Sequence, residues 1–142
     1  MKTFKTVMFF VALLFFISLI VIGAEKLTND GTLHKQNSLS DEMRELGLAA
    51  VEIVDDYLKD RINAETAYAR LETNLDKQDA LIMKEKIKYD VDSIYDSPVK
   101  QDGEVWFNTF ALVGKFRDKI SGVGTDSSIR EQRDKLEDAI RG

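Results

Sequence analysis

The sequence contains no cysteine and only one histidine, His34. The absence of cysteine excludes disulfides, thiolate metal sites, cysteine nucleophiles and lipid attachment at an N-terminal cysteine. His34 lies in a polar stretch that we expect to be a solvated linker, whereas a general-base histidine needs a rigid frame. Glycine-rich phosphate loops and metal-protease helix motifs are also absent. The sequence therefore predicts no catalytic residue and no cofactor, although a hydrolase built from dispersed residues stays open as an alternative.

One long segment lacks charge altogether. It runs from Thr6 to Ala24, and Phe, Leu, Ile and Val fill most of it. As a helix rising ~1.5 Å per residue it would reach about 28 Å, close to the ~30 Å hydrocarbon core of a bilayer. Lys2 and Lys5 precede it, and positive charge on that side favours a cytoplasmic N-terminus. We therefore predict that residues 1–24 enter the membrane and that the rest of the chain lies outside the cytoplasm.

The same segment has two alternative fates, retention as an anchor or removal as a signal peptide. Gly23 and Ala24 are small residues of the kind that precede a cleavage site, but the other small position would fall on Val21 or Ile22. The apolar core of a signal peptide spans about 7–15 residues, and this run is longer. We predict a retained single-pass anchor, with secretion after cleavage as the alternative.

Acidic residues outnumber basic residues beyond the hydrophobic segment. Two of the 20 Lys and Arg residues precede residue 25 and all 25 Asp and Glu residues lie from there on, so the remainder carries a formal charge of −7. Such a surface repels nucleic acid and anionic lipid headgroups, which excludes nucleic acid as the expected partner. We predict a flexible polar stalk over residues 25–38 and an extracytoplasmic helical domain over residues 39–142.

Apolar residues after the stalk recur at the spacing of amphipathic helices. The first predicted helix begins after Ser38 or Ser40, and the second begins after Asn63, because serine and asparagine are favoured N-caps. The expected inner faces of these two helices are Met43, Leu46, Ala50, Ile53, Val54, Tyr57 and Leu58, then Ala64, Ala67, Tyr68, Leu71 and Leu75.

Polar residues at positions 76–79 interrupt the second stripe. A new stripe follows at Ala80, Met83, Ile87, Val91 and Ile94, with Leu81 and Ile82 beside it. Either one bent helix or two helices in series would explain this shift of phase. We predict a break or bend at residues 76–79.

Pro98, the only proline, marks the clearest boundary of the domain. Apolar residues beyond it predict a central, largely buried helix, with a strand over residues 105–110 as the alternative. Asp126, Ser127 or Ser128 is predicted to cap a last helix. The expected inner faces are Trp106, Phe110, Val113, Phe116 and Ile120, with Val105, Phe107 and Leu112 beside them, then Ile129, Leu136, Ile140 and the stem of Arg133.

These patterns predict an all-α fold. An N-terminal transmembrane or signal helix would be followed by a small antiparallel bundle of four to five helices. Residues 51–71, VEIVDDYLKDRINAETAYARL, resemble a pattern in small exported proteins of Gram-positive bacteria, and SSIREQRDKLEDAI resembles their closing helix. The resemblance implies a helical, exported domain. The matching positions are helix caps and core residues, so the resemblance implies no reaction.

Three carboxylates are the candidate metal ligands, Asp55, Asp56 and Asp60. Two of them stand four residues apart and would share one face of a helix within reach of a hard cation such as Ca²⁺. Two ligands are too few, so the sequence favours a solvated acidic face with Lys59 and Arg61 as partners, and no metal.

The aromatic residues of the third segment offer a second candidate site. Trp106, Phe107, Phe110 and Phe116 would line a binding groove if they faced outward, but aromatic residues at helical spacing favour the core.

The function predicted from the sequence is that of a membrane-anchored extracytoplasmic module that binds a protein partner or has a structural role in the envelope. The alternatives are a secreted or tethered binder of a small ligand or divalent cation, and the hydrolase without a recognisable motif named above. The expected partners are the membrane, through the N-terminal helix, and a second protein outside the cytoplasm.

Overall fold

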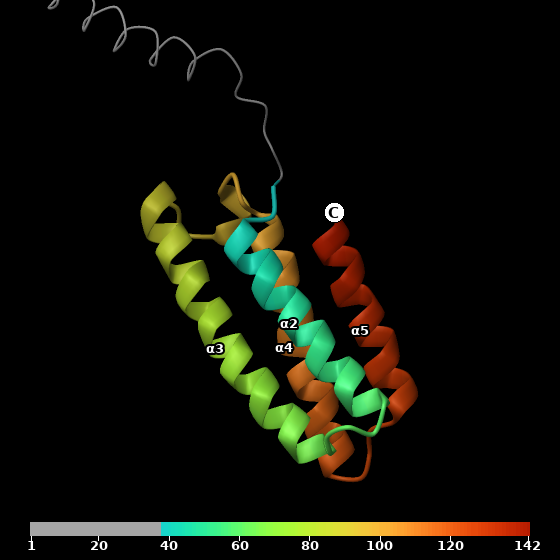
Figure 1. Ribbon diagram of the computed structural model, residues 1–142. Helices are drawn as coiled ribbons and strands as arrows, with labels where there is room; N and C mark the ends of the chain where they lie inside the picture. Colours follow the sequence, from blue (N-terminus) through green and yellow to red (C-terminus); the bar gives the residue numbers. More distant parts are fainter. Residues whose placement is uncertain (1–37) are drawn as a thin grey trace, which may run out of the picture. The chain divides into compact units, whose positions relative to one another are not determined.

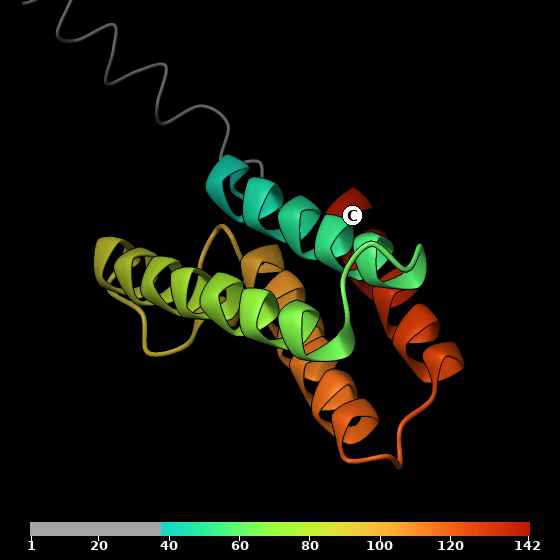
Figure 2. The same ribbon diagram turned by 60° about the horizontal axis from the view of Figure 1, so that its bottom comes forward.

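Four α-helices and one short 3-10 helix make up residues 38–142, the part of the chain that the computed structural model describes (Figure 1). They are α2 (Asp41–Leu58), α3 (Ala64–Tyr89), η1 (Ile94–Asp96), α4 (Gln101–Ile120) and α5 (Asp126–Arg141). Successive helices run in opposite directions, and α2 contacts α4 in the middle of the bundle, with α3 on one side of this pair and α5 on the other (Figures 1 and 2). The predicted all-α bundle is therefore confirmed for this part of the chain.

The N-terminal predictions lie outside the described residues, apart from the last position of the stalk. Ser38 packs with the domain, since its backbone N–H donates to the carbonyl oxygen of Pro98 at 3.4 Å and the next residue, Leu39, is buried. The membrane segment at residues 1–24 and the stalk at residues 25–37 stay predictions. No helix between residues 38 and 142 combines the length and the apolar character needed to cross a membrane.

Side-chain caps explain where the helices begin. The Ser40 hydroxyl accepts from the backbone N–H of Met43 at 3.2 Å, and the Asn63 side chain accepts from the N–H of Thr66 at 2.9 Å, which confirms both predicted caps. The predicted cap of the last helix is wrong by one residue or more, because Thr125 is its N-cap and the helix begins at Asp126. Four consecutive residues there have cap-forming side chains, and only the extended backbone of Thr125 distinguishes it.

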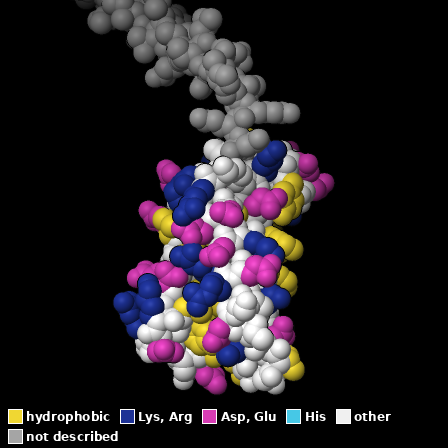
Figure 3. All heavy atoms as spheres, turned by 90° about the vertical axis from the view of Figure 1, so that its right-hand side faces the viewer, with side chains coloured by type: hydrophobic (Ala, Val, Ile, Leu, Met, Phe, Trp, Pro, Cys, Tyr) yellow, Lys and Arg dark blue, Asp and Glu magenta, His cyan; other side chains and the backbone are white. Residues whose placement is uncertain are grey.

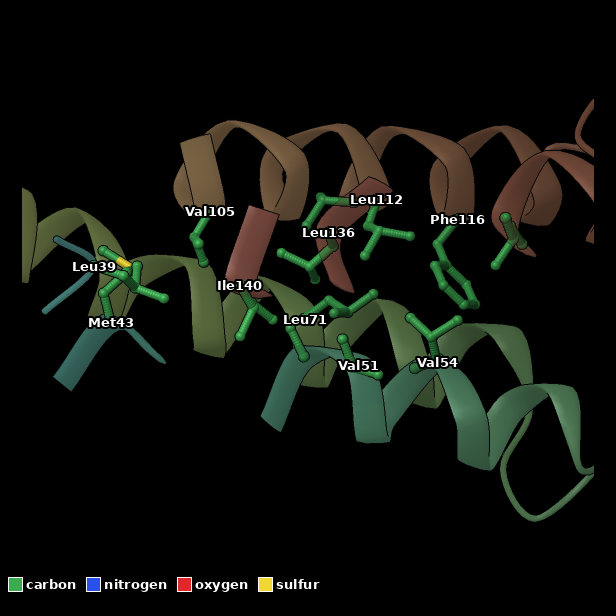
Figure 4. Close-up of a cluster of buried hydrophobic side chains, with 14 of the residues drawn as sticks. Leu39, Met43, Val51, Val54, Leu71, Val105, Leu112, Phe116, Leu136 and Ile140 are labelled. Carbon is green, nitrogen blue, oxygen red and sulfur yellow. The ribbon is translucent and has the colours of Figure 1, made fainter. Parts of the chain in front are cut away.

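The core runs along the middle of the bundle and draws on all four α-helices (Figure 4). Met43, Leu71, Phe116 and Leu136 are fully buried, one from each helix. Each such side chain contributes about 1.5–3 kcal/mol through removal of apolar surface from water. The inner faces predicted for the first, second and last helices are confirmed: none of their members is exposed to solvent.

Of the break or bend predicted at residues 76–79, the break is wrong. Helix α3 continues through this point as one helix of 26 residues. Its inner face passes through two polar residues, Asn74 and Gln78, which are buried. Gln78 donates to Asn74 Oδ1 at 2.8 Å and to Thr109 Oγ1 of α4 at 3.0 Å. These hydrogen bonds replace hydrogen bonds to water that are lost on burial. The two polar residues can therefore occupy inner positions without ending the helix.

The apolar stripe predicted after this point is wrong within α3, although its last member, Ile94, is buried. The inner face of α3 continues through Leu81 and Glu85, whereas Met83 and Ile87 lie outside with 56% and 76% of their surface exposed. The apolar pattern followed the outer face because the inner face was partly polar. Met83 and Ile87 are therefore exposed apolar side chains that do not pack into the core of the bundle.

Helix α4 replaces the strand alternative over residues 105–110, but its predicted inner face is only partly right. Val113 and Phe116 are buried, whereas Phe110 and Ile120 are exposed. The face that enters the core instead includes Asp102 and Thr109. The expectation of a helix buried on most sides is therefore wrong, since α4 presents aromatic residues to solvent.

Gly47 allows α2 to approach its neighbours closely. A Cβ atom at this position would lie 2.9 Å from Val105 Cγ1 of α4 and 3.0 Å from Ile140 Cδ1 of α5. Real Cβ atoms rarely come so near another side chain. Glycine is therefore required here by packing, although its backbone is ordinary helix.

Candidate functional site

The first predicted metal ligand, Asp55, lies in a network of ion pairs between α2 and α5. Arg133 Nε lies 3.0 Å from Asp55 Oδ1, and Lys59 Nζ lies 3.7 Å from the other carboxylate oxygen. Arg133 also contacts Glu137 on its own helix. Asp55 thus joins the last turn of α2 to the middle of α5 and is neutralised by basic groups.

The other two predicted ligands do not join it. Asp56 pairs with Arg61, with 3.1 Å between the carboxylate and guanidinium atoms. Helix α2 ends at Leu58, and Asp60 follows it with φ of 55°, so the expected helical spacing of Asp56 and Asp60 does not form. Between residues 38 and 142 no three acidic or histidine side chains are arranged to hold a metal ion. The partners Lys59 and Arg61 are those expected of a solvated acidic face.

The four aromatic residues proposed as a groove separate in the structure. Phe116 is fully buried, with Tyr57 of α2 packed edge-on at 4.9 Å between ring centroids. Trp106 is half-buried, and Phe107 and Phe110 each expose 54% of their surface. Three of the four therefore lie together on the outside of α4. His34, the remaining residue considered from the sequence, lies outside the described part of the chain.

Exposed apolar residues continue from α4 onto α3 and η1. We define the aromatic face as Met83, Ile87, Tyr95, Trp106, Phe107 and Phe110. The Trp106 and Phe110 rings stack with centroids 5.8 Å apart and planes inclined by 19°. The indole N–H of Trp106 donates to Asp79 of α3, which fixes the ring across the boundary between the two helices. Figure 3 shows hydrophobic side chains along its right-hand edge, which is the far side of the bundle in Figure 1.

A groove of about 410 Å³ lies where the residues of this face on α3 and η1 meet those on α4. Met83 of α3, Tyr95 of η1 and Trp106 of α4 line it, and Asp79 and Lys86 lie at its polar border. A larger open groove of about 670 Å³ lies between α2 and α3, lined mainly by small or polar side chains such as Ala69 and Thr73. Only the first groove combines an apolar lining with large exposed side chains.

A buried carboxylate that the sequence did not single out lies at the start of α4. Asp102 is fully buried and accepts from the backbone N–H of Ser40 at 2.8 Å and from its hydroxyl at 2.6 Å. Burial raises the pKa of Asp102 above its ordinary value, against the effect of the two Ser40 hydrogen bonds, and the charges of Glu85 and Glu42 raise it further. Asp102 thus links the beginning of α2 to α4.

Asp102 was missed because acidic residues are common in the first turn of a helix, where they favour the positive end of the dipole. Nothing in its neighbours along the chain distinguishes a buried carboxylate from a solvated one. Ser40, its partner, is 62 residues away. A second acidic residue, Glu85 of α3, is also buried, and Lys88 lies 3.5 Å from one of its oxygens.

Asp102 and Glu85 are buried acidic residues, while the aromatic face is the strongest candidate for recognition. The first pair is enclosed by packed helices, so its role is to join elements. The second is open to solvent. Comparison with protein-family models, with curated proteins and with solved structures found no match to this chain.

Proposed function

We propose that this protein is a non-catalytic interaction module held outside the cytoplasm by its N-terminal hydrophobic segment, and that the aromatic face is its docking surface. The observation that carries the proposal is the continuity of exposed apolar side chains across α3, η1 and α4. Single exposed hydrophobic residues are ordinary on soluble proteins and need no explanation. A contiguous group with a rigid, stacked aromatic pair at its centre does need one.

The size of the face supports a protein partner. Aromatic side chains bury about 150–250 Å² each when covered, so four partly exposed aromatic residues with Met83 and Ile87 offer on the order of several hundred Å². Apolar patches of roughly 300–600 Å² are often functional on monomers. Aromatic residues are also enriched among the few interface residues that carry most binding energy.

The composition of the rest of the surface supports the same proposal. Charged residues cover the outer side of α5, where Glu131 and Lys135 pair at 2.8 Å and Arg141 pairs with Glu137. That side is solvated and offers no apolar contact. The positive charge before the hydrophobic segment and the resemblance to exported proteins support placement of the domain outside the cytoplasm.

The proposal is tested by removing the exposed rings from α4. The double variant Phe107→Ser/Phe110→Ser is compared with Leu48→Ser/Val123→Ser, which removes two exposed apolar side chains outside the aromatic face. Both full-length variants are produced in the native host, treated with a lysine-reactive cross-linker, and their complexes are resolved by mass. We expect the first variant to lose its cross-linked species by tenfold or more and the second to retain them.

Equal cross-linking of the two double variants would overturn the proposed docking surface. A turnover activity that disappears on mutation of a few polar residues would overturn the non-catalytic assignment. Thermal unfolding of both variants checks that the loss of complexes does not come from loss of the fold.

A further inference from the structure

The outer side of α4 has a self-complementary arrangement of side chains. Glu104, Phe107, Ala111 and Gly114 follow one another at intervals of three or four residues and therefore share one face of the helix. Phe107 projects a large exposed ring. Gly114 is the opposite case, since a Cβ atom at this position would meet nothing within 4 Å. The same face thus contains a protruding side chain and, two turns later, room for one.

Two such faces fit together when the helices run antiparallel. In a pair centred near Phe110, residues at equal distances before and after the centre lie opposite one another. Phe107 stands three residues before this centre and Gly114 four residues after it, so the ring of one copy meets the open position of the other. Small residues at a contact let helices approach closely and allow large side chains from the partner to pack.

Two charged residues of α4 are also placed at similar distances on either side of this centre. Glu104 stands six residues before Phe110, and Lys115 stands five residues after it. Both lie on the side of α4 that faces away from Trp106, and neither forms an ion pair with another residue in the described part of the chain. A twofold axis keeps this side of one helix next to the same side of the other, so each Glu104 lies near the partner copy's lysine. A rim of opposite charges fixes the register of an interface and contributes little affinity.

We propose that the α4 part of the aromatic face, Phe107 and Phe110, is covered by a second copy of this chain, docked through α4 in an antiparallel, twofold-symmetric contact centred near Phe110. This inference rests on the proposed function, because it names the partner of the docking surface described above. The apolar area of the face is below the ~800 Å² per partner of a standard interface, so the dimer is a reversible one. A shared membrane anchor would raise its effective concentration.

The absence of cysteine makes the contact directly testable in the full-length chain. Ala111→Cys places a single thiol one residue from the proposed centre, so a disulfide formed under mild oxidation joins two copies. Leu48→Cys is the matched control, because it places an exposed thiol on α2, outside the aromatic face. In membranes from the native host, or in the culture supernatant if the chain is released, we expect at least tenfold more disulfide-linked dimer from Ala111→Cys.

A charge exchange tests the antiparallel register. In the Ala111→Cys background, Glu104→Lys is expected to lower the yield of dimer severalfold because two lysines then face each other across the contact. Addition of Lys115→Glu to the same chain is expected to restore the yield, since the pair is re-formed with reversed signs. Only pairing between two copies of this chain predicts this rescue. Absence of rescue would overturn the antiparallel contact.

The remaining outcomes separate this inference from the proposed function. Equal cross-linking of Leu48→Cys and Ala111→Cys would overturn the α4 contact, because the copies would then meet without regard to the aromatic face. If Ala111→Cys stays monomeric while Phe107→Ser/Phe110→Ser still loses a cross-linked complex, the face binds another protein or a lipid, and only the self-association is overturned. If neither variant changes any complex, both proposals are overturned.

Discussion

Helices α4 and α5 are neighbours of similar length, yet their outer sides differ in kind. Both bury an apolar stripe in the same core, with Phe116 on α4 and Leu136 on α5 fully covered. The outer side of α5 is charged and forms ion pairs within the helix. The outer side of α4 exposes Phe107 and Phe110. Because α5 shows that a polar exterior is compatible with this packing, the fold alone does not account for the aromatic exterior of α4.

The comparison predicts its largest effect at the inner side of α4. Phe116→Ala should lower the free energy of unfolding by about 3–5 kcal/mol, because it removes a buried ring and leaves a cavity. Phe110→Ala, six residues earlier on the same helix, should lower it by only about 0.5–1.5 kcal/mol, since the ring is half exposed and loses mainly its stacking on Trp106. Urea unfolding followed by circular dichroism measures both. Similar losses for the two variants would contradict the division of α4 into an inner and an outer side.

Two glycines sharpen the same division. Gly47→Ala should cost about 1–3 kcal/mol because its methyl group meets Val105 and Ile140 across the helix interface. Gly114→Ala should raise stability by up to ~1 kcal/mol, because alanine is the better helix former and its methyl group meets nothing nearby. Thermal unfolding of the two variants at low concentration, where a dimer does not contribute, distinguishes them. If Gly47→Ala instead raised stability, the contacts of α2 with α4 and α5 would have room for a methyl group.

Burial of Asp102 at the start of α4 predicts that the stability of the fold depends on pH. The pKa of Asp102 is raised in the folded chain, so its favourable contribution is present below the unfolded value and is lost as pH rises through the folded pKa. Asp102→Asn removes this titration and keeps an oxygen that accepts from Ser40. Relative to the parent chain, the variant should therefore become more stable as pH increases from about 4 to 7. Glu45→Gln is the control on α2, because Glu45 is exposed; an identical response of both variants would contradict the effect of burial.

The smallest effect is expected on the outer side of α5. Lys135→Ala removes an exposed ion pair with Glu131, and such pairs on helix surfaces contribute little. We expect neither the unfolding transition nor the dimer yield of the Ala111→Cys chain to change measurably. A lower dimer yield would show that α5 takes part in the contact between copies.

Sequence patterns predicted the helices well where local interactions decide them. Ser40 and Asn63 cap their helices as expected, since a cap is formed with a backbone N–H only three residues away. The apolar spacing gave a wrong prediction for α3, because Asn74 and Gln78 occupy inner positions there. Their hydrogen bonds reach Leu46 of α2 and Thr109 of α4, which are 28 and 31 residues distant. A polar residue on an inner face can be recognised only when its partner is known.

The candidate site was predicted in part. Trp106, Phe107 and Phe110 were considered as a binding groove beside Phe116, which the structure assigns to the core. Met83 and Ile87 had been assigned to an inner stripe and lie outside. The error has the same origin in both cases, because spacing shows which residues share a face but does not show which face meets the core.

The sequence by itself determined the all-helical class of residues 38–142, the caps of the first two helices and most of the apolar side chains available for a core. These follow from short-range hydrogen bonds and from the helical repeat. The tertiary structure alone decided that Asp102 is buried against Ser40, that α3 is continuous and that the aromatic residues of α4 are divided between core and surface. Each of these depends on the packing of helices that are distant along the chain, since that packing decides which groups lose contact with water and which partners replace it.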